Sequence, residues 1–363
     1  MAVGKPTCVG FRSVNSSKSM RILLIKMSSM GDVFHTFPAL SDALQAWPDL
    51  QVDWVVEEGF AEIPQWHPAV DQVFPIALRR WRKTFWQGST RHEIRTFFQT
   101  INQTHYDLVL DAQGLLKSLW VMRKISSGER IGMDWQSVRE PLASLGYQRT
   151  VSVPKAQHAI MRLRQLFSAA LGYEDVSASP VQYRLDTSNW QRPDSLPTDF
   201  QNSPYYVCLH GTTWKTKLWP EDYWRDLLAK LTASGQKVVL PWGTEAEHER
   251  ALRLAKSLKN DQAWVPDSPL GLNAMARLLK FADGIVSVDT GLSHVAAALE
   301  TPMVVLYRVT DPELVGALGA NVRRLASPCA RQYLKRFQSD EQAEQSLEYL
   351  RPDDVLNALE SVV

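Results

Sequence analysis

The 363-residue sequence is poor in cysteine and has almost no net charge. Its three cysteines, at positions 8, 208 and 329, are too far apart for a disulfide framework or a CxxC metal site, which suits a reducing cytosol. Forty Lys and Arg residues against 39 Asp and Glu residues give a formal charge of +1. This balance argues against a protein that coats nucleic acid.

Long apolar segments are also lacking. No stretch approaches the about 18 apolar residues of a membrane-spanning helix. Residues 1–19 contain three basic residues but no apolar core of the kind that a signal peptide requires, so we expect a disordered leader. The sequence therefore predicts a soluble, cytoplasmic protein.

The signatures of common cofactor and metal chemistry are absent. There is no G-x-G-x-x-G fingerprint, which disfavours a nicotinamide oxidoreductase, and no G-x-x-x-x-G-K-[ST] phosphate loop. H-x-x-x-H, D-x-D and cysteine clusters are missing as well, so no metal site is expected. What is present is an ordinary 45% of hydrophobic residues and an unusual 13 tryptophans.

Apolar runs that end in polar loops recur along the chain, as parallel strands buried on both faces require. Strands are predicted at residues 21–27, 52–58, 106–112, 205–210, 237–241, 284–288 and 302–307. One helix is predicted from apolar residues at 33, 37, 40 and 44 and ends at Trp47-Pro48. Another begins with Pro220, and a short amphipathic helix is predicted over 352–359.

A segment rich in Pro, Ser, Asp and Asn near residues 173–204 predicts a linker. We divide the chain into a leader (1–19), an N-terminal domain (20–180), a linker (181–204), a C-terminal domain (205–345) and a C-terminal helix (346–363). Two strand–helix series predict an α/β protein of two doubly wound domains that face a central cleft. That cleft suits an enzyme that joins two substrates, one held by each domain.

The first candidate site is Ser28-Ser29-Met30-Gly31-Asp32, between the first strand and its helix. Gly31 allows a ligand or backbone to approach closely, and Asp32 lies where a general base would face the cleft. The alternative is a helix cap, which this position favours by itself.

Other loops after predicted strands carry groups that bind diphosphates and sugars. The segment HGTTWKTK (210–217) supplies hydroxyls, lysines and a helix N-terminus. In VDTGLSH (288–294), Asp289 suits a sugar and the amides after it suit a phosphate. A single Asp-Thr-Gly in an α/β pattern excludes an aspartic protease, and Val295 breaks the G-x-S-x-G of a hydrolase. Solvated lysines and helix capping are the alternatives.

A basic and aromatic stretch, RRWRKTFWQGSTRHEIR (79–95), holds six Lys or Arg residues against one Glu. Because the whole chain is nearly neutral, this local charge favours a headgroup-sized anionic ligand at a membrane surface over a long polyanion. A solvated helix face is the alternative.

In their order along the chain, several motifs resemble those of the ADP-heptose-using glycosyltransferases of family 9. They are Lys26-Met27-Ser28-Ser29-Met30-Gly31-Asp32-Val33, Asp111-Ala112-Gln113-Gly114, Gly132-Met133-Asp134-Trp135, Arg139-Glu140-Pro141, Leu218-Trp219-Pro220-Glu221, Pro241-Trp242-Gly243 and Asp289-Thr290-Gly291-Leu292-Ser293-His294. The resemblance covers residues 20–360. The Ser-Ser-Met-Gly-Asp form is similar to the members that add the first heptose rather than to those that act later.

The resemblance implies a GT-B fold and inverting transfer of L-glycero-D-manno-heptose from ADP-heptose to Kdo of Kdo2-lipid A, with no required cofactor. It makes Asp32 the catalytic base. The donor-binding residues that it implies are Thr212, Thr213, Lys217, Glu247 (or Glu245 in its place), Asp289, Thr290, Gly291, Leu292 and His294. The acceptor-binding residues that it implies are Arg79, Arg82, Lys83 and Arg139.

The same resemblance implies a monomer held peripherally on the cytoplasmic face of the inner membrane, with no nucleic-acid partner. Trp214 and Leu218 lie where other residues are expected in the family. A heptosyltransferase acting later in the core remains an alternative, as does a non-catalytic ADP-sugar-binding protein, against which Asp32 argues.

Overall fold

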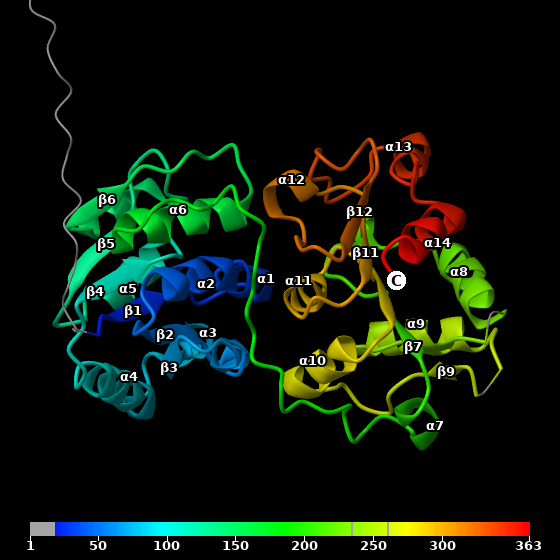
Figure 1. Ribbon diagram of the computed structural model, residues 1–363, viewed down its shortest axis with the longest axis horizontal. Helices are drawn as coiled ribbons and strands as arrows, with labels where there is room; N and C mark the ends of the chain where they lie inside the picture. The colour runs from blue at the N-terminus through cyan, green and yellow to red at the C-terminus, as the bar shows by residue number, and fades with distance from the viewer. Residues whose placement is uncertain (1–18, 234, 260) are drawn as a thin grey trace, which may run out of the picture.

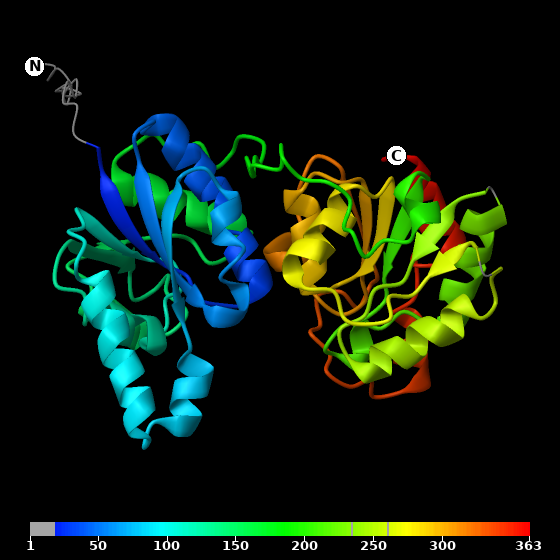
Figure 2. The same ribbon diagram turned by 90° about the horizontal axis from the view of Figure 1, so that it is seen from below.

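The computed structural model describes residues 19–233, 235–259 and 261–363. The predicted leader therefore lies outside the described residues, apart from its last position. The chain forms two lobes side by side, each built on a parallel six-stranded sheet flanked by helices (Figures 1 and 2). The predicted fold class is confirmed.

The N-terminal lobe contains a sheet with the strand order β3-β2-β1-β4-β5-β6. Its strands are β1 (Arg21–Ile25), β2 (Gln51–Glu57), β3 (Val70–Ile76), β4 (Leu108–Asp111), β5 (Glu129–Met133) and β6 (Arg149–Val151). Its helices are α1 (Met30–Phe34), α2 (Phe37–Ala46), α3 (Leu78–Thr84), α4 (Gly88–Ile101), α5 (Leu116–Met122), the 3-10 helix η3 (Pro141–Gly146) and α6 (Ala159–Leu171). The order reverses between β1 and β4, where doubly wound sheets bind their ligands.

The C-terminal lobe repeats this topology with the order β12-β11-β10-β7-β8-β9. Its strands are β7 (Tyr205–Leu209), β8 (Lys237–Val239), β9 (Ala263–Trp264), β10 (Gly284–Val288), β11 (Met303–Tyr307) and β12 (Val322–Ala326). Its helices are α8 (Glu221–Ala233), α9 (Glu245–Ala255), α10 (Leu272–Lys280), α11 (Gly291–Ala298), α12 (Pro312–Val315), α13 (Asp340–Gln345) and α14 (Pro352–Glu360). The reversal point here lies between β7 and β10.

Alternation along β1 explains how this strand is buried on both faces. Ile22 and Leu24 pack with α2 and α6, whereas Leu23 and Ile25 pack with residues of α3, α4 and α5. Buried residues of α2 and α6 belong to the same apolar cluster as those of α10 and α11. The core is therefore continuous from one lobe to the other.

The predicted strands are confirmed to within two residues at each end. One predicted helix is wrong: the chain expected to be helical from residue 33 to 46 forms α1 and α2, with a break at His35 and Thr36. Pro38 explains the break, because proline has no N–H to donate to the carbonyl four residues earlier. The helix expected to include Pro220 begins one residue later, with Glu221.

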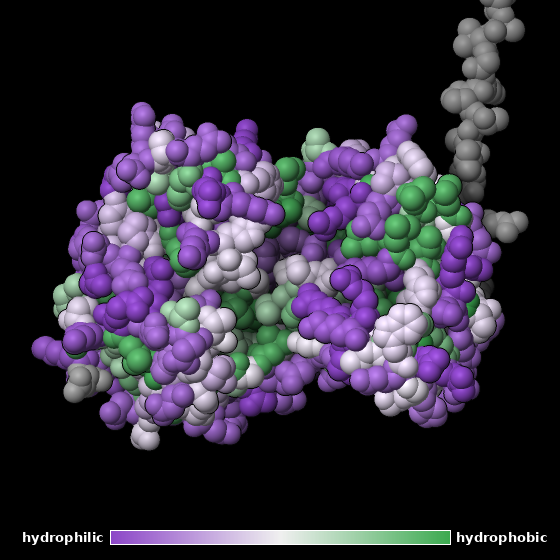
Figure 3. Space-filling model, turned by 180° about the vertical axis from the view of Figure 1, so that it is seen from behind, coloured by the Kyte–Doolittle hydropathy of each residue, from purple (hydrophilic) through white to green (hydrophobic). Residues whose placement is uncertain are grey.

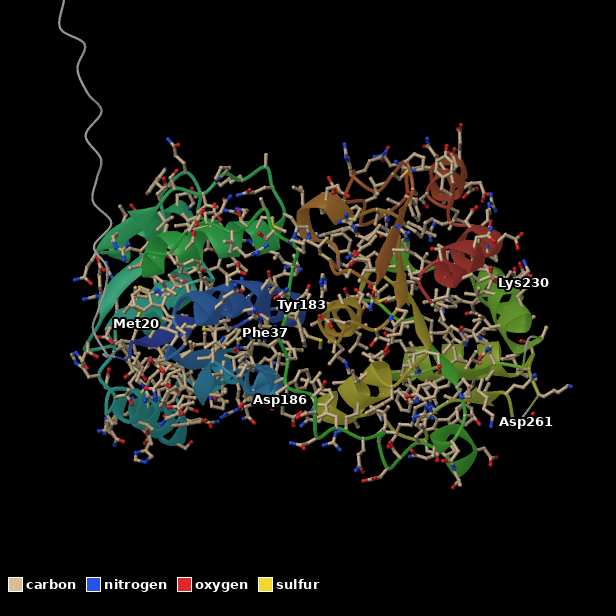
Figure 4. The ribbon with its side chains drawn as sticks, viewed as in Figure 1. Met20, Phe37, Tyr183, Asp186, Lys230 and Asp261 are labelled. Carbon is tan, nitrogen blue, oxygen red and sulfur yellow. The ribbon has the colours of Figure 1, made fainter. Side chains whose placement is uncertain are left out.

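The chain between α6 and β7 contains one short helix, α7 (Thr198–Gln201), and runs between the lobes (Figures 1 and 4). Tyr183 and Asp186 lie on this segment (Figure 4). The Tyr183 hydroxyl donates to the carbonyl of Leu318 in the C-terminal lobe at 2.7 Å. The Asp186 amide donates to the carbonyl of Trp66 in the N-terminal lobe at 2.8 Å. The predicted linker thus contacts both lobes.

Asp53 is fully buried in the N-terminal sheet and yields a stability prediction. Its carboxylate accepts from Arg21 at 2.8 Å and from the Tyr106 hydroxyl at 3.0 Å. Asp53→Ala leaves the Arg21 guanidinium and the Tyr106 hydroxyl away from water without their hydrogen-bond acceptor. We therefore expect it to lower the free energy of unfolding by about 3 kcal/mol. Asp71→Ala removes the exposed partner of the same arginine and should cost at most about 1 kcal/mol. Urea unfolding followed by circular dichroism measures both, and equal losses would contradict the burial argument.

Candidate functional site

The two lobes meet where α1 and α11 begin. Each of these helices follows a strand beside the reversal point of its sheet. Across the contact, Nε2 of His35 lies 3.1 Å from Nδ1 of His294. The surface is hollowed between the lobes (Figure 3), and two cavities there are lined by residues of both lobes.

Gly31 is required by this contact between the lobes. A Cβ atom at Gly31 would lie 2.7 Å from Cδ2 of the His294 ring. Burial lowers the pKa of both His35 and His294, so two neutral rings share their hydrogen bond, one nitrogen donating and the other accepting. Gly31 thus accommodates a side chain of the opposite lobe, whereas the sequence predicted a ligand or backbone at this point.

Asp32 occupies the third position of α1. Its Oδ2 accepts hydrogen bonds from the amide and the hydroxyl of Ser29, at 2.8 and 2.9 Å. The side chain is 36% exposed and lines a cavity of about 200 Å³. Asp32 therefore caps its own helix, as the alternative interpretation held, and also faces the space in which a general base would act.

The surroundings of Asp32 keep its carboxylate ionised. Burial by itself would raise the pKa, but the Lys26 ammonium and the hydrogen bonds from Ser29 outweigh burial and lower the pKa of Asp32 to about 2. The Nζ atom of Lys26 lies 3.8 Å from Oδ1 of Asp32 and donates to the carbonyl of Ala112 at 3.0 Å. Asp32 is therefore a permanent negative charge at neutral pH.

The loop after β4 fixes the segment that precedes Asp32. The side-chain oxygen of Gln113 accepts from the amides of Met27 and Ser28 at 2.9 and 3.0 Å. Asp111 is buried and accepts from the amides of Gln113 and Gly114. The motif from 111 to 114 therefore orients the loop that carries the candidate base.

The basic stretch 79–95 forms α3 and the first half of α4. Three of its cations, Arg79, Arg82 and Lys83, are exposed and line a cavity of about 660 Å³. Arg80 differs, because its guanidinium forms ion pairs with Glu58 and Glu93 at 3.0 and 2.7 Å. The structure therefore brings the three predicted acceptor residues together in one cavity, whereas two glutamates balance the charge of Arg80.

Lys117 links this larger cavity to the segment that carries Asp32. Lys117 lines the larger cavity, and its Nζ donates to the hydroxyl of Ser28 at 2.8 Å. Arg139, the fourth predicted acceptor residue, is exposed and lines the smaller cavity together with Asp32. Of the four predicted acceptor residues, Arg139 therefore shares a cavity with the candidate base, and the other three line a separate, larger cavity.

Lys217 and Asp289 form an ion pair of 2.7 Å in the C-terminal lobe. Thr310 also donates to the Asp289 carboxylate, and Thr212 donates to the Asp289 backbone carbonyl at 2.9 Å. Thr213, the remaining predicted hydroxyl, is exposed. The lysine predicted to meet a diphosphate is therefore paired with the carboxylate predicted to meet a sugar.

A cavity of about 320 Å³ lies at the N-termini of α9 and α11, and Glu247 lines it. Oε2 of Glu247 accepts from the amides of Gly243 and Thr244 at 2.9 and 3.1 Å. Glu245 has a side chain 79% exposed and lies 3.6 Å from His248. The geometry thus favours Glu247 over Glu245 as the acid that faces a bound nucleoside.

The start of α11 lines the same cavity through Thr290 and Leu292. The helix begins at Gly291, and the Thr290 side chain accepts no hydrogen bond from its first turn, so the amides of Gly291 and Leu292 are available to an anion. His294 is buried and its ring is directed at His35. The side chain of His294 therefore contacts the N-terminal lobe, whereas the start of its helix lines the cavity.

Comparison with known proteins identifies the family. The family model described as glycosyltransferase family 9 (heptosyltransferase) matches residues 94–346. The chain belongs to glycosyltransferase family 9. It is similar to a Pseudomonas aeruginosa protein named lipopolysaccharide heptosyltransferase 1, with 51% identity over 313 residues that cover 86% of this chain and 85% of the relative.

Solved structures are similar as well. E. coli heptosyltransferase WaaC with ADP matches with a TM-score of 0.83 and 42% identity, covering 95% of this chain and 100% of that one. E. coli heptosyltransferase WaaC with ADP-2-deoxy-2-fluoro heptose matches with a TM-score of 0.79 and 42% identity over the same shares. This family 9 protein is therefore a glycosyltransferase with the GT-B fold, as predicted.

Some residues that shape the site of this family 9 enzyme were not predicted. Lys26 is the one with a usable signal, since a lone lysine directly after a buried strand needs a partner. His35 and Thr310 gave no signal, because their partners lie 259 and 21 residues away in the sequence.

Among the residues that the structure places, no group of three or more His, Cys, Asp or Glu side chains could hold a metal ion. Across the same residues, no helix combines the length and the apolar character needed to cross a bilayer. Independence from metal stays a prediction.

The Lys26–Asp32 pair yields a prediction about titration. Lys26→Met keeps the bulk of the buried side chain and removes its charge, so the pKa of Asp32 should rise from about 2 by at least about one unit. Carbon-13 NMR of labelled aspartate measures this titration. Lys117→Met is the matched control, because Lys117 contacts Ser28 instead of Asp32, and it should produce a smaller shift. If the pKa of Asp32 were unchanged in Lys26→Met, the Lys26 ammonium would not be a cause of its low value.

Proposed function

We propose that this enzyme transfers L-glycero-D-manno-heptose from ADP-heptose to Kdo of Kdo2-lipid A, with inversion at the anomeric carbon. The observation that carries the proposal is the ionised carboxylate of Asp32 at the interlobe contact, with an anion-binding helix start opposite it. The names of the similar proteins support heptose as the sugar and ADP-heptose as the donor.

In the proposed reaction, the C-terminal lobe binds the donor. Glu247 accepts hydrogen bonds from the adenosine ribose, and Asp289 holds the heptose. The amides at the start of α11 and the Lys217 ammonium face the diphosphate. These groups stabilise the negative charge that grows on ADP as the glycosidic bond breaks, so the proposed reaction needs no metal ion.

In the N-terminal lobe, Asp32 removes the proton from the acceptor hydroxyl. The oxygen of that hydroxyl attacks the anomeric carbon while the bond to ADP breaks on the opposite face. Because the pKa of Asp32 is low, the proton is transferred late, when the attacking oxygen already carries positive charge. The fixed loop between Ser28 and Asp32 aligns the carboxylate for this step.

On the acceptor side, the proposal assigns carboxylates and phosphates of Kdo2-lipid A to Arg79, Arg82, Lys83 and Arg139. All four side chains are exposed; Arg139 lines the same cavity as Asp32, whereas the other three line the larger cavity. Such an acceptor resides in a membrane, so we further propose that the enzyme acts as a monomer attached peripherally to the cytoplasmic face of the inner membrane.

The direct test incubates the enzyme with ADP-heptose and either Kdo2-lipid A or a core that already carries one heptose. Mass spectrometry should show one added heptose on the first acceptor only. Transfer to the heptosylated core alone would establish the later-acting alternative. ADP-heptose binding without transfer to either acceptor would establish the non-catalytic alternative.

Asp32 variants test the proposed base. Asp32→Ala should reduce turnover by at least about 10²-fold, because no base remains to remove the proton from the hydroxyl of the acceptor substrate. The affinity for ADP-heptose should change little. Asp32→Asn retains an oxygen for the Ser29 hydrogen bonds and should lose as much. Rapid-quench kinetics and calorimetry measure the two quantities, and near-wild-type turnover in Asp32→Asn would remove the carboxylate from the mechanism.

Charge reversal tests the proposed acceptor residues. Replacing Arg79, Arg82 and Lys83 with Glu should raise the acceptor KM at least about tenfold and leave the donor Kd unchanged. The matched control reverses three exposed cations of the other lobe, at Lys256, Lys259 and Arg323, and so changes the net charge equally. If both sets of charge reversals raised the acceptor KM equally, the effect would come from the net charge of the protein, and the proposed acceptor site would be contradicted.

A further inference from the structure

Exposed apolar side chains are concentrated on one part of the N-terminal lobe. Among the described residues, thirteen large apolar side chains are at least 36% exposed, and seven of them lie between residues 85 and 145. They are Phe85, Trp86, Leu116, Trp120, Trp135, Leu142 and Leu145. Trp86, at 87%, is the most exposed of the thirteen. So much exposed apolar surface in one region marks an interaction site.

These side chains lie on neighbouring elements. Phe85, at the end of α3, and Trp120, on α5, line the same 660 Å³ cavity. The helix η3, which carries Leu142 and Leu145, packs against α5, where a Cβ atom at Gly146 would meet Leu119. We call the exposed surface of α3, α4, α5 and η3, together with residues 85–87 between α3 and α4 and residues 123–124 after α5, the docking face. The α3–α4 pair projects from the lobe on the side away from the linker (Figure 2).

The docking face is also basic. A second groove, of about 560 Å³, lies along α4, and its lining includes Arg91, Arg95 and Lys124, which follows α5. It shares Ile94 with the larger cavity, so the two adjoin. Residues 79–124 contain nine Lys or Arg and three Asp or Glu; of the acids, Asp111 is buried and Glu93 pairs with Arg80. Apolar and charged residues alternate on this side of the lobe (Figure 3).

We infer that the docking face binds the surface of an anionic lipid bilayer. Exposed aromatic side chains beside cations match the two layers of such a surface, the acyl boundary and the negative headgroups. Phe85 and Trp86 enter the boundary, and Arg91, Arg95 and Lys124 contact phosphates. The inference rests on the proposed function, because it explains how an acceptor embedded in a membrane meets the cavity that Arg79, Arg82 and Lys83 line within the docking face.

The test uses vesicles of phosphatidylcholine, with and without phosphatidylglycerol, and measures cosedimentation of the full chain. The wild type should bind the anionic vesicles and lose binding in high salt. Trp86→Ala and the double variant Arg91→Gln/Arg95→Gln should each bind at least about tenfold more weakly. Leu252→Ala removes an exposed apolar side chain of the C-terminal lobe and should bind like the wild type.

A second readout separates this inference from the proposed function. With a water-soluble, deacylated acceptor, Trp86→Ala should transfer heptose at the wild-type rate, whereas with the acceptor embedded in anionic vesicles it should be slower. A wild type that binds anionic vesicles but transfers to neither acceptor would overturn the function and leave the docking face standing. Three results would overturn the inference. The wild type could bind neutral vesicles as well as anionic ones, or both docking-face variants could bind anionic vesicles as well as the wild type. The wild type could also bind a heparin column but no vesicles, which would indicate a site for polyanions.

Discussion

The contact between the starts of α1 and α11 is the constraint on which the site depends. Each lobe of this family 9 glycosyltransferase has a reversal point in its strand order, and in the proposed reaction each lobe binds one substrate. The neutral rings of His35 and His294, 3.1 Å apart, join the two helices, and Gly31 leaves the space that the second ring needs. The candidate base and the candidate phosphate site are therefore neighbours because the lobes touch at this point.

Charge is arranged in the same way on both sides of the contact. In each lobe a lysine lies beside a carboxylate, Lys26 beside Asp32 and Lys217 beside Asp289. In the N-terminal lobe the lysine keeps the carboxylate ionised, as a base must be. In the C-terminal lobe, the proposed reaction has a diphosphate compete with Asp289 for Lys217 and so free the Asp289 carboxylate for the sugar.

The sequence predicted seven of the twelve strands that the structure describes, because parallel strands buried on both faces produce apolar runs whose limits are clear. It missed β3, β5, β6, β9 and β12, which are only partly buried and carry no such run. The strand at 284–288 was predicted to the residue, because its apolar run begins at Gly284 and the polar Asp289 follows its last residue. The helix break at His35 was missed, because the apolar spacing continues through it and only Pro38 indicates the interruption. The helix at Pro352 was placed correctly at its start, where proline favours a first turn.

The site was predicted less completely, for a physical reason. The motifs indicated which loops carry chemistry, but pairings depend on folding distant segments together. Nothing local distinguishes Arg80, which Glu58 and Glu93 neutralise, from Arg79 beside it. Likewise the choice between Glu245 and Glu247 follows from the helix turn, which places Glu247 in the cap and the cavity. His35 acquires its role only from a partner in the other lobe.

The most direct test of this account is a crystal structure of the enzyme with an unreactive ADP-heptose analogue. The account predicts that the nearest carboxylate oxygen of Asp32 lies about 5–6 Å from the anomeric carbon, leaving room for an acceptor oxygen about 3 Å from each. It also predicts that Asp32 lies on the face opposite the diphosphate. A carboxylate on the same face as the diphosphate, or one more than about 10 Å from the anomeric carbon, would contradict the account.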